Sequence, residues 1–153
     1  MKMKLAEALA ERAAIKTKLS TLSTRLQANS KVYEGEDPVE DPKRMLEELN
    51  ILTDRYAELV NSINTANAVT KASNGETLSV LLARREALTN KVAVLNSLLK
   101  STDPEPRGYR NKDQLREIVI VDVPSLRKEA DDLSKIIRET DALIQAANWN
   151  TEI

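Results

Sequence analysis

The sequence contains no cysteine and no histidine among its 153 residues. The absence of cysteine excludes disulfide bonds, thiolate metal sites and cysteine nucleophiles. The absence of histidine removes the commonest metal ligand and the commonest general base. Phosphate-binding glycine loops and the Gly-x-Ser-x-Gly motif are also missing, and a chain with three glycines has little room for them. We therefore expect no enzymatic activity, no metal and no cofactor.

Aromatic residues are scarce as well, at 3% of the chain, with no phenylalanine and one tryptophan. Apolar residues nevertheless make up 41%, which is enough for a core that must be aliphatic. Such a core suits thin, closely packed helix pairs. The shortage of glycine limits tight turns, so the composition favours a few long helices over many short elements.

Long hydrophobic runs are absent too. The longest uncharged stretch, Leu59–Thr70, contains many Asn, Ser and Thr residues, and no segment approaches the roughly 20 apolar residues of a membrane span. After the opening Met-Lys-Met-Lys, charges are too frequent for a secretory signal. We expect a cytoplasmic protein without stable membrane insertion.

The charges nearly balance, with 23 basic and 24 acidic residues, so no basic excess suggests nucleic acid as a partner. They are uneven along the chain: residues 1–29 carry about +4, 31–59 about −5, 76–100 about +2 and 123–153 about −2. This alternation favours complementary packing between neighbouring helices, with partner-binding patches as the alternative.

Four segments repeat apolar residues at alternating steps of three and four, which predicts four helices, each with one apolar stripe. The stripes are Leu5, Ala8, Arg12, Ile15, Leu19, Leu22, Leu26; Met45, Leu49, Leu52, Tyr56, Leu59, Ile63, Ala66; Leu78, Leu81, Arg85, Leu88, Val92, Leu95, Leu99; and Leu126, Ala130, Leu133, Ile137, Thr140, Ile144, Ala147. Further apolar residues beside them, Leu46, Leu82, Leu98 and Ile136, widen each face toward two neighbours.

The predicted helices span residues 3–29, 42–68, 77–100 and 123–148. Asp41 is a suitable N-cap with Pro42 in the first helical position, Asp122 is the cap of the last helix, and Asn74-Gly75 marks a turn. Residues 101–112 hold two prolines and one glycine and should form a loop. Short links make the first three helices antiparallel neighbours. We expect a mainly α protein, one domain over residues 1–153, forming a four-helix bundle or antiparallel coiled coil.

One stretch departs from the helical pattern. Residues 117–121 (Glu-Ile-Val-Ile-Val) form a β-branched run that predicts a short strand. Its partner would be Lys31-Val32-Tyr33, giving a two-stranded β-ribbon, or the same strand of a second copy of the protein.

Polar residues at stripe positions are the candidate functional residues. A buried arginine must be paired, so Arg12 and Arg85 would need Glu11, Glu86 or Glu48 as partners. Together with Asn64 and Asn67 they could form a buried polar network that fixes helix register. Alternatively, the two arginines reach solvent along their aliphatic stems, or they line an anion or ligand pocket.

Trp149 lies beyond the last stripe residue. It could cover one end of the bundle, or it could anchor a partner chain, as tryptophan often does at interface centres. Ile118 and Ile120 in the predicted strand are further candidate interface residues.

Four stretches resemble the septicolysin-like family of small bacterial helical proteins, and the resemblance extends over essentially the whole chain. They are Met3–Leu9, Leu82-Ala83-Arg84-Arg85-Glu86, Val121-Asp122-Val123 and Ile144–Thr151. The resemblance implies a helical fold, and the family label implies membrane-acting, pore-forming activity; it assigns no functional residue.

We therefore expect a self-associating structural or protein-interaction module, a homo-oligomer without catalytic activity. The alternative is a septicolysin-type membrane-acting toxin. A ligand-binding or enzymatic pocket that gathers Arg12, Arg85 and Asn67 is a weaker third hypothesis.

Overall fold

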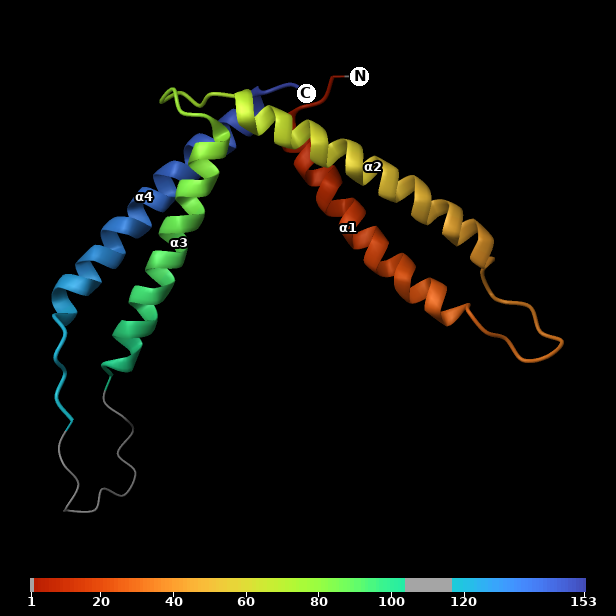
Figure 1. Ribbon diagram of the computed structural model, residues 1–153, viewed down its shortest axis with the longest axis horizontal. Helices are drawn as coiled ribbons and strands as arrows, with labels where there is room; N and C mark the ends of the chain where they lie inside the picture. The colour runs from red at the N-terminus through yellow and green to blue at the C-terminus, as the bar shows by residue number, and fades with distance from the viewer. Residues whose placement is uncertain (1, 104–116) are drawn as a thin grey trace, which may run out of the picture. The chain divides into compact units, whose positions relative to one another are not determined.

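The computed structural model describes residues 2–103 and 117–153, and in these residues the protein is mainly α-helical (Figure 1). The four helices are α1 (Leu5–Ala28), α2 (Pro42–Val69), α3 (Leu78–Ser101) and α4 (Val123–Asn150). Their ends lie within one or two residues of the predicted ends. The fold contains two compact units, one formed by the residues up to Leu78 together with Gln145–Ile153, the other by Ser79–Ile144.

The first unit is built on a hairpin of α1 and α2, which pack along each other (Figure 1). Glu11 early in α1 pairs with Arg55 in the middle of α2, whereas Arg25 near the end of α1 pairs with Glu48 near the start of α2. This order of contacts shows that the two helices are antiparallel, as the short link predicts.

Both chain ends belong to this first unit and pair with each other. The backbone N–H of Met3 donates to the carbonyl oxygen of Ile153 at 3.2 Å, and Ile153 donates back to Met3 at 2.9 Å. The Leu5 N–H donates to Thr151 at 2.9 Å, so the start of α1 is hydrogen-bonded to the residues that follow α4. These bonds hold the last turn of α4 in the first unit.

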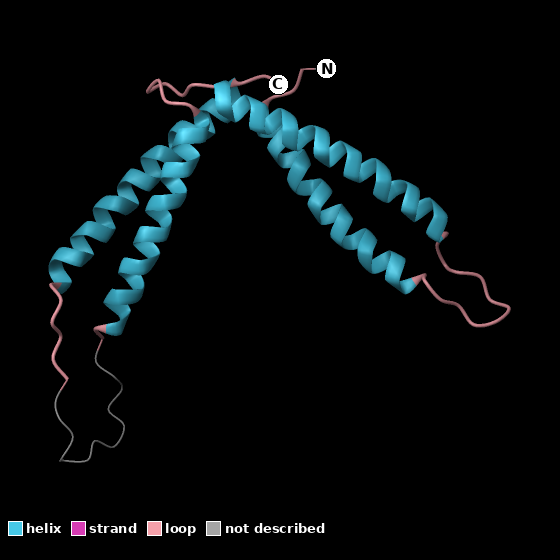
Figure 2. Ribbon diagram, in the orientation of Figure 1, coloured by secondary structure: helices cyan, strands magenta, loops and turns pink. Residues whose placement is uncertain are grey.

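The second unit is a hairpin of α3 and α4, which run side by side (Figures 1 and 2). Arg85 in the first half of α3 pairs with Asp141 in the second half of α4, and Lys91 pairs with Glu129 further along. These contacts again identify an antiparallel pair. Within each hairpin, a helix with a net positive charge therefore packs against a helix with a net negative charge.

The helix starts and the turn follow the local chemistry expected from the sequence. The Asp41 carboxylate accepts from the Lys43 N–H at 2.9 Å with Pro42 in the first turn, and Asp122 accepts from the Ser125 N–H at 3.1 Å. Gly75 has φ +83°, a left-handed conformation in which a side chain would be strained, and it makes the turn before α3. All three predictions are confirmed.

The stripes form the interior of each hairpin. Every one of the 28 predicted stripe positions is buried or half-buried. The largest fully buried side chains all belong to this set: Leu5, Leu22, Ile63, Leu78 and Leu81. The 3–4 spacing therefore identified the core-facing side of all four helices.

The predicted β-ribbon is wrong. The described residues contain no strand, only two isolated bridges, Lys4 with Glu152 and Lys71 with Thr77. Residues 117–120 are irregular and exposed, and so are Lys31–Tyr33 (Figure 2). A β-branched run favours an extended backbone, but a strand also needs a hydrogen-bonding partner. The loop predicted at residues 101–112 lies mostly outside the described residues.

Candidate interaction surfaces

Arg85 has an acidic partner, but not one that the sequence suggested. Its guanidinium is ion-paired with Asp141 across the α3–α4 hairpin, and both side chains remain more than a third exposed. Beside it the Lys91 Nζ lies 2.6 Å from the Glu129 carboxylate. Arg85 thus lies over the stripe on its aliphatic stem and places its charge at the edge of the hairpin.

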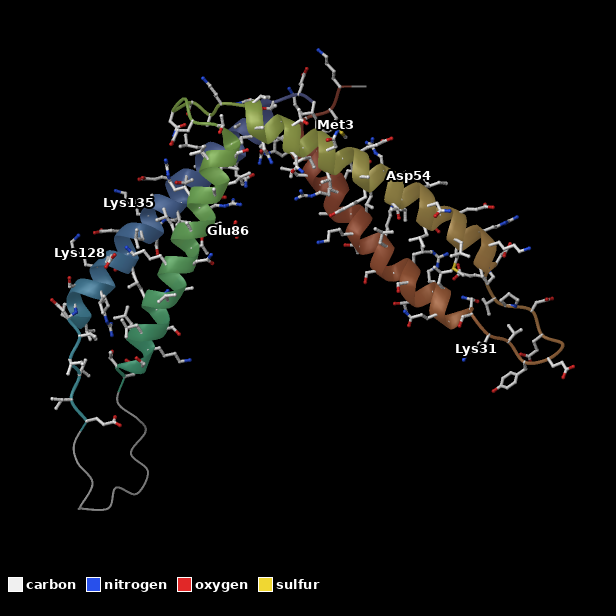
Figure 3. The ribbon with its side chains drawn as sticks, viewed as in Figure 1. Met3, Lys31, Asp54, Glu86, Lys128 and Lys135 are labelled. Carbon is white, nitrogen blue, oxygen red and sulfur yellow. The ribbon has the colours of Figure 1, made fainter. Side chains whose placement is uncertain are left out.

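The other members of the predicted polar network occupy different environments. Arg12 and Asn67 are half-buried, and Asn64 is exposed. Glu86 is exposed and projects from α3 on the side away from α4 (Figure 3). The described structure does not join these residues to Arg85 in one buried network, because Asp141 rather than Glu86 balances the arginine.

An ion-pair cluster that the sequence did not reveal lies between α1 and α2. Arg55 donates through Nε and Nη2 to the two carboxylate oxygens of Glu11, at 2.7 and 2.9 Å, and through Nη1 to Glu58 at 3.2 Å. These hydrogen bonds lower the pKa of Glu11 and raise the pKa of Arg55. Burial of Glu11 acts in the opposite direction and is the weaker effect.

A second cluster fixes the base of the loop between α1 and α2. Arg25 donates to both carboxylate oxygens of Glu40, through Nε at 3.2 and 3.0 Å and through Nη2 at 2.5 Å, and these bonds lower the pKa of Glu40 and raise the pKa of Arg25. The Asn29 amide donates to the carbonyl of Arg25 at 2.9 Å and accepts from the Glu40 N–H at 3.0 Å. These hydrogen bonds therefore connect the end of α1 to Glu40, just before the start of α2.

The loop between α1 and α2 lines an open cavity of about 570 Å³, formed by residues between Ala28 and Val39. A smaller cavity of about 290 Å³ lies between α3 and α4, beside Leu99 and Ala130. Neither is lined by Arg12, Arg85 or Asn67, the residues of the predicted pocket. Across residues 2–103 and 117–153, no three Asp or Glu side chains are placed to hold a metal ion.

The three candidate interface residues are all exposed to solvent. Trp149 is 62% exposed, Ile118 78% and Ile120 89%. Trp149 follows the buried Ala147 and Asn148, so the end of α4 turns its other side to the core and leaves the indole outside. The exposure of the indole leaves both alternatives for this residue, covering an end of the bundle or anchoring a partner chain, as predictions.

The sequence reasoning missed a second stripe on α3. Its members lie three or four residues apart, as in the core stripe, it begins two residues later, and it contains no charged residue; we call it the outer stripe. Its members, all exposed, are Val80, Ala83, Ala87, Asn90, Val94, Leu98 and Ser101. Testing each helix for a second repeat, offset from the first, would have found it.

The fold defines a class, a helical protein built from paired antiparallel helices with exposed apolar side chains. A family of unknown function (DUF6847) matches residues 3–153, and the chain belongs to this family. A crystal structure of a functionally unknown conserved protein from Corynebacterium diphtheriae is similar, with 37% identity and a TM-score of 0.92 over 100% of this chain and 99% of that one. No curated protein matches the sequence.

These comparisons correct the family assignment. The resemblance to septicolysin-like proteins is wrong, since the whole of the quoted motif set falls in a match to the other family and nothing points to a septicolysin. In the described residues, no helix combines the length and the apolar content that crossing a bilayer requires. The pore-forming alternative, which came with that resemblance, is therefore left without support.

Proposed function

We propose that the protein is a self-associating helical module, a structural or protein-interaction component without catalytic activity. The observation that carries this proposal is the set of large apolar side chains on the solvent side of both hairpins. Ile51 on α2 is 69% exposed and Val94 on α3 is 67% exposed, in addition to Trp149. Apolar faces of this kind mark sites of protein contact when they are contiguous.

The construction of a two-helix hairpin supports the proposal. Each helix buries one stripe against its partner within the hairpin. This arrangement buries all the apolar surface of a helix that is apolar on one side only. Helix α3, however, carries apolar residues on two sides. Covering the second side takes another layer of helices, which a second copy can supply.

The four-helix bundle belongs to the same proposal in a finer form. Two hairpins, one from each of two copies, packed face to face would have the layered core of a bundle, with side chains of one pair filling spaces between those of the other. Ile118 and Ile120 offer a further apolar contact beside the start of α4. The cytoplasmic location and the lack of catalysis stay predictions.

The solution mass tests the proposal directly. Size-exclusion chromatography with light scattering, run from low to high micromolar concentration, should give a mass that rises above the 17.1 kDa of one chain. A mass of one chain at every concentration would overturn it. The absence of cysteine means that disulfide exchange cannot produce a false oligomer.

A further inference from the structure

The outer stripe of α3 lies well away from the surface that contacts α4. At about 100° per residue, its centre is about 140° around the helix from the core stripe. All seven members are exposed, and the stripe extends over about 30 Å of helix at 1.5 Å per residue. Val80, Val94 and Leu98 provide its large side chains, and Ala83 and Ala87 its small ones.

We propose that the outer stripe of α3 binds the outer stripe of a second copy of this chain, antiparallel, with the two-fold axis beside Asn90. The inference rests on the proposed self-association and names the surface and the partner. A two-fold axis makes the contact isologous, so one face must be complementary to itself.

The order of large and small residues supplies that complementarity. When two copies of α3 lie antiparallel about Asn90, Val94 of each faces Ala87 of the other, and Leu98 faces Ala83. Each contact therefore places a branched side chain over an alanine, and each occurs twice. Interdigitation of this kind allows close helix approach without voids. A parallel pair would place Ala87 against Ala87 and Val94 against Val94, which leaves gaps and collisions in alternation.

The polar residue at the centre fits the same arrangement. Asn90 of each copy lies beside the axis, and a carboxamide can both donate to and accept from its symmetry mate. A single asparagine in an otherwise apolar helix contact is a known device for fixing register and orientation. In this position it would align the four large-on-small contacts.

The charges of α3 are arranged so that two copies can approach. The outer stripe itself has no charge. Arg85 and Lys91 are ion-paired with Asp141 and Glu129 on α4, with 2.6 Å between the Lys91 Nζ and the Glu129 carboxylate. A standard interface buries at least about 1,200 Å², and one helix pair of this length buries less. We therefore expect a weak dimer, with a dissociation constant in the micromolar range.

Single-cysteine variants of the full chain test the register, because the natural chain has no cysteine. Under mild oxidation, a mixture of Ala87→Cys and Val94→Cys should form a heterodimeric disulfide, since these positions face each other across the axis. Each variant alone should remain largely unlinked, because its two cysteines lie about seven residues apart along the helices. Thr89→Cys, exposed on α3 outside the outer stripe, is the matched control and should link with neither.

The outcomes separate this inference from the proposed function. Disulfide dimers of Ala87→Cys alone would overturn the antiparallel register. An oligomer by light scattering in which the mixture does not link would overturn the outer stripe as its surface, while self-association would stand. A monomer at all concentrations would overturn both.

A charge substitution provides a second measurement. Val94→Glu should raise the dissociation constant of the dimer by more than about tenfold, because each copy would bury an unpaired carboxylate against Ala87. Thr89→Glu adds the same charge to the same helix outside the outer stripe and should leave the constant within about twofold. Circular dichroism of both variants establishes that the helices are retained. Equal effects of the two substitutions would overturn the proposal.

Discussion

At the scale of single residues, the Glu11–Arg55 contact predicts a pH-dependent stability. Hydrogen bonds from Arg55 hold the pKa of Glu11 below its ordinary value in the folded state. Their contribution is therefore fully present above the ordinary pKa and is lost as the pH falls through the folded value. Glu11→Gln should lower the melting temperature at pH 7 by about 1–3 °C, since water screens the half-exposed pair, and this difference should shrink between about pH 5 and pH 2.

The matched control is Glu47→Gln, which removes the same charge from an exposed position on α2. Its melting temperature should differ from that of the natural chain by less than about 1 °C at pH 7. If the two variants behave alike, or if the effect of Glu11→Gln is the same at pH 7 and pH 3, the ion pair does not stabilise the hairpin in the way described.

Partners of individual charged residues were the part of the site that sequence could predict least. The spacing placed Arg85 correctly over the apolar stripe, and it is half-buried as the stripe requires. The spacing could not identify Asp141 as its partner, because that choice depends on which helix lies alongside and in what register. The same holds for Arg55 and Glu11, which lie 44 residues apart in the chain.

At the scale of helices, the two aspartate caps predict a local loss of stability. Asp41 and Asp122 each accept a backbone N–H in the first turn, of α2 and α4 respectively. Asp41→Ala and Asp122→Ala should each cost about 1 kcal/mol of unfolding free energy, because an N–H is left without its acceptor. Urea unfolding followed by circular dichroism measures the cost, and Asp54→Ala, on the exposed middle of α2 (Figure 3), should show none. A cost at Asp54 equal to that at the caps would contradict the capping argument.

The helices themselves were predictable because their determinants are local. Periodic apolar residues, the caps Asp41 and Asp122, and the Asn74-Gly75 turn all lie within a few residues of what they specify. The conformation of residues 117–121 could not be predicted in the same way, because a strand depends on a hydrogen-bonding partner. Lys31–Tyr33 does not supply that partner in the described structure. The outer stripe of α3 was overlooked for a different reason: the core stripe already explained the helix, and Leu98 was interpreted as widening that face.

At the scale of the whole molecule, the sequence predicts how much apolar surface each helix presents, and the pairing of helices had to come from the structure. Four similar stripes are compatible with several pairings, because 3–4 spacing specifies a face and not a neighbour. Short links correctly favoured the α1–α2 hairpin. One domain over residues 1–153 stays a prediction, and the chain contains two compact units.

The order of these units along the chain leads us to expect one cooperative unfolding transition. The first unit needs Gln145–Ile153, which follow the second unit, so its completion closes a loop around Ser79–Ile144. Closing that loop costs less entropy when the intervening chain is already folded, and this links the stability of the two units.

Leu22→Ala in the first unit and Leu81→Ala in the second remove equally buried side chains and should each cost about 2–4 kcal/mol. In differential scanning calorimetry both should shift a single transition whose calorimetric and van't Hoff enthalpies agree. Two transitions, of which each variant moves only one, would contradict this expectation and identify two independent domains.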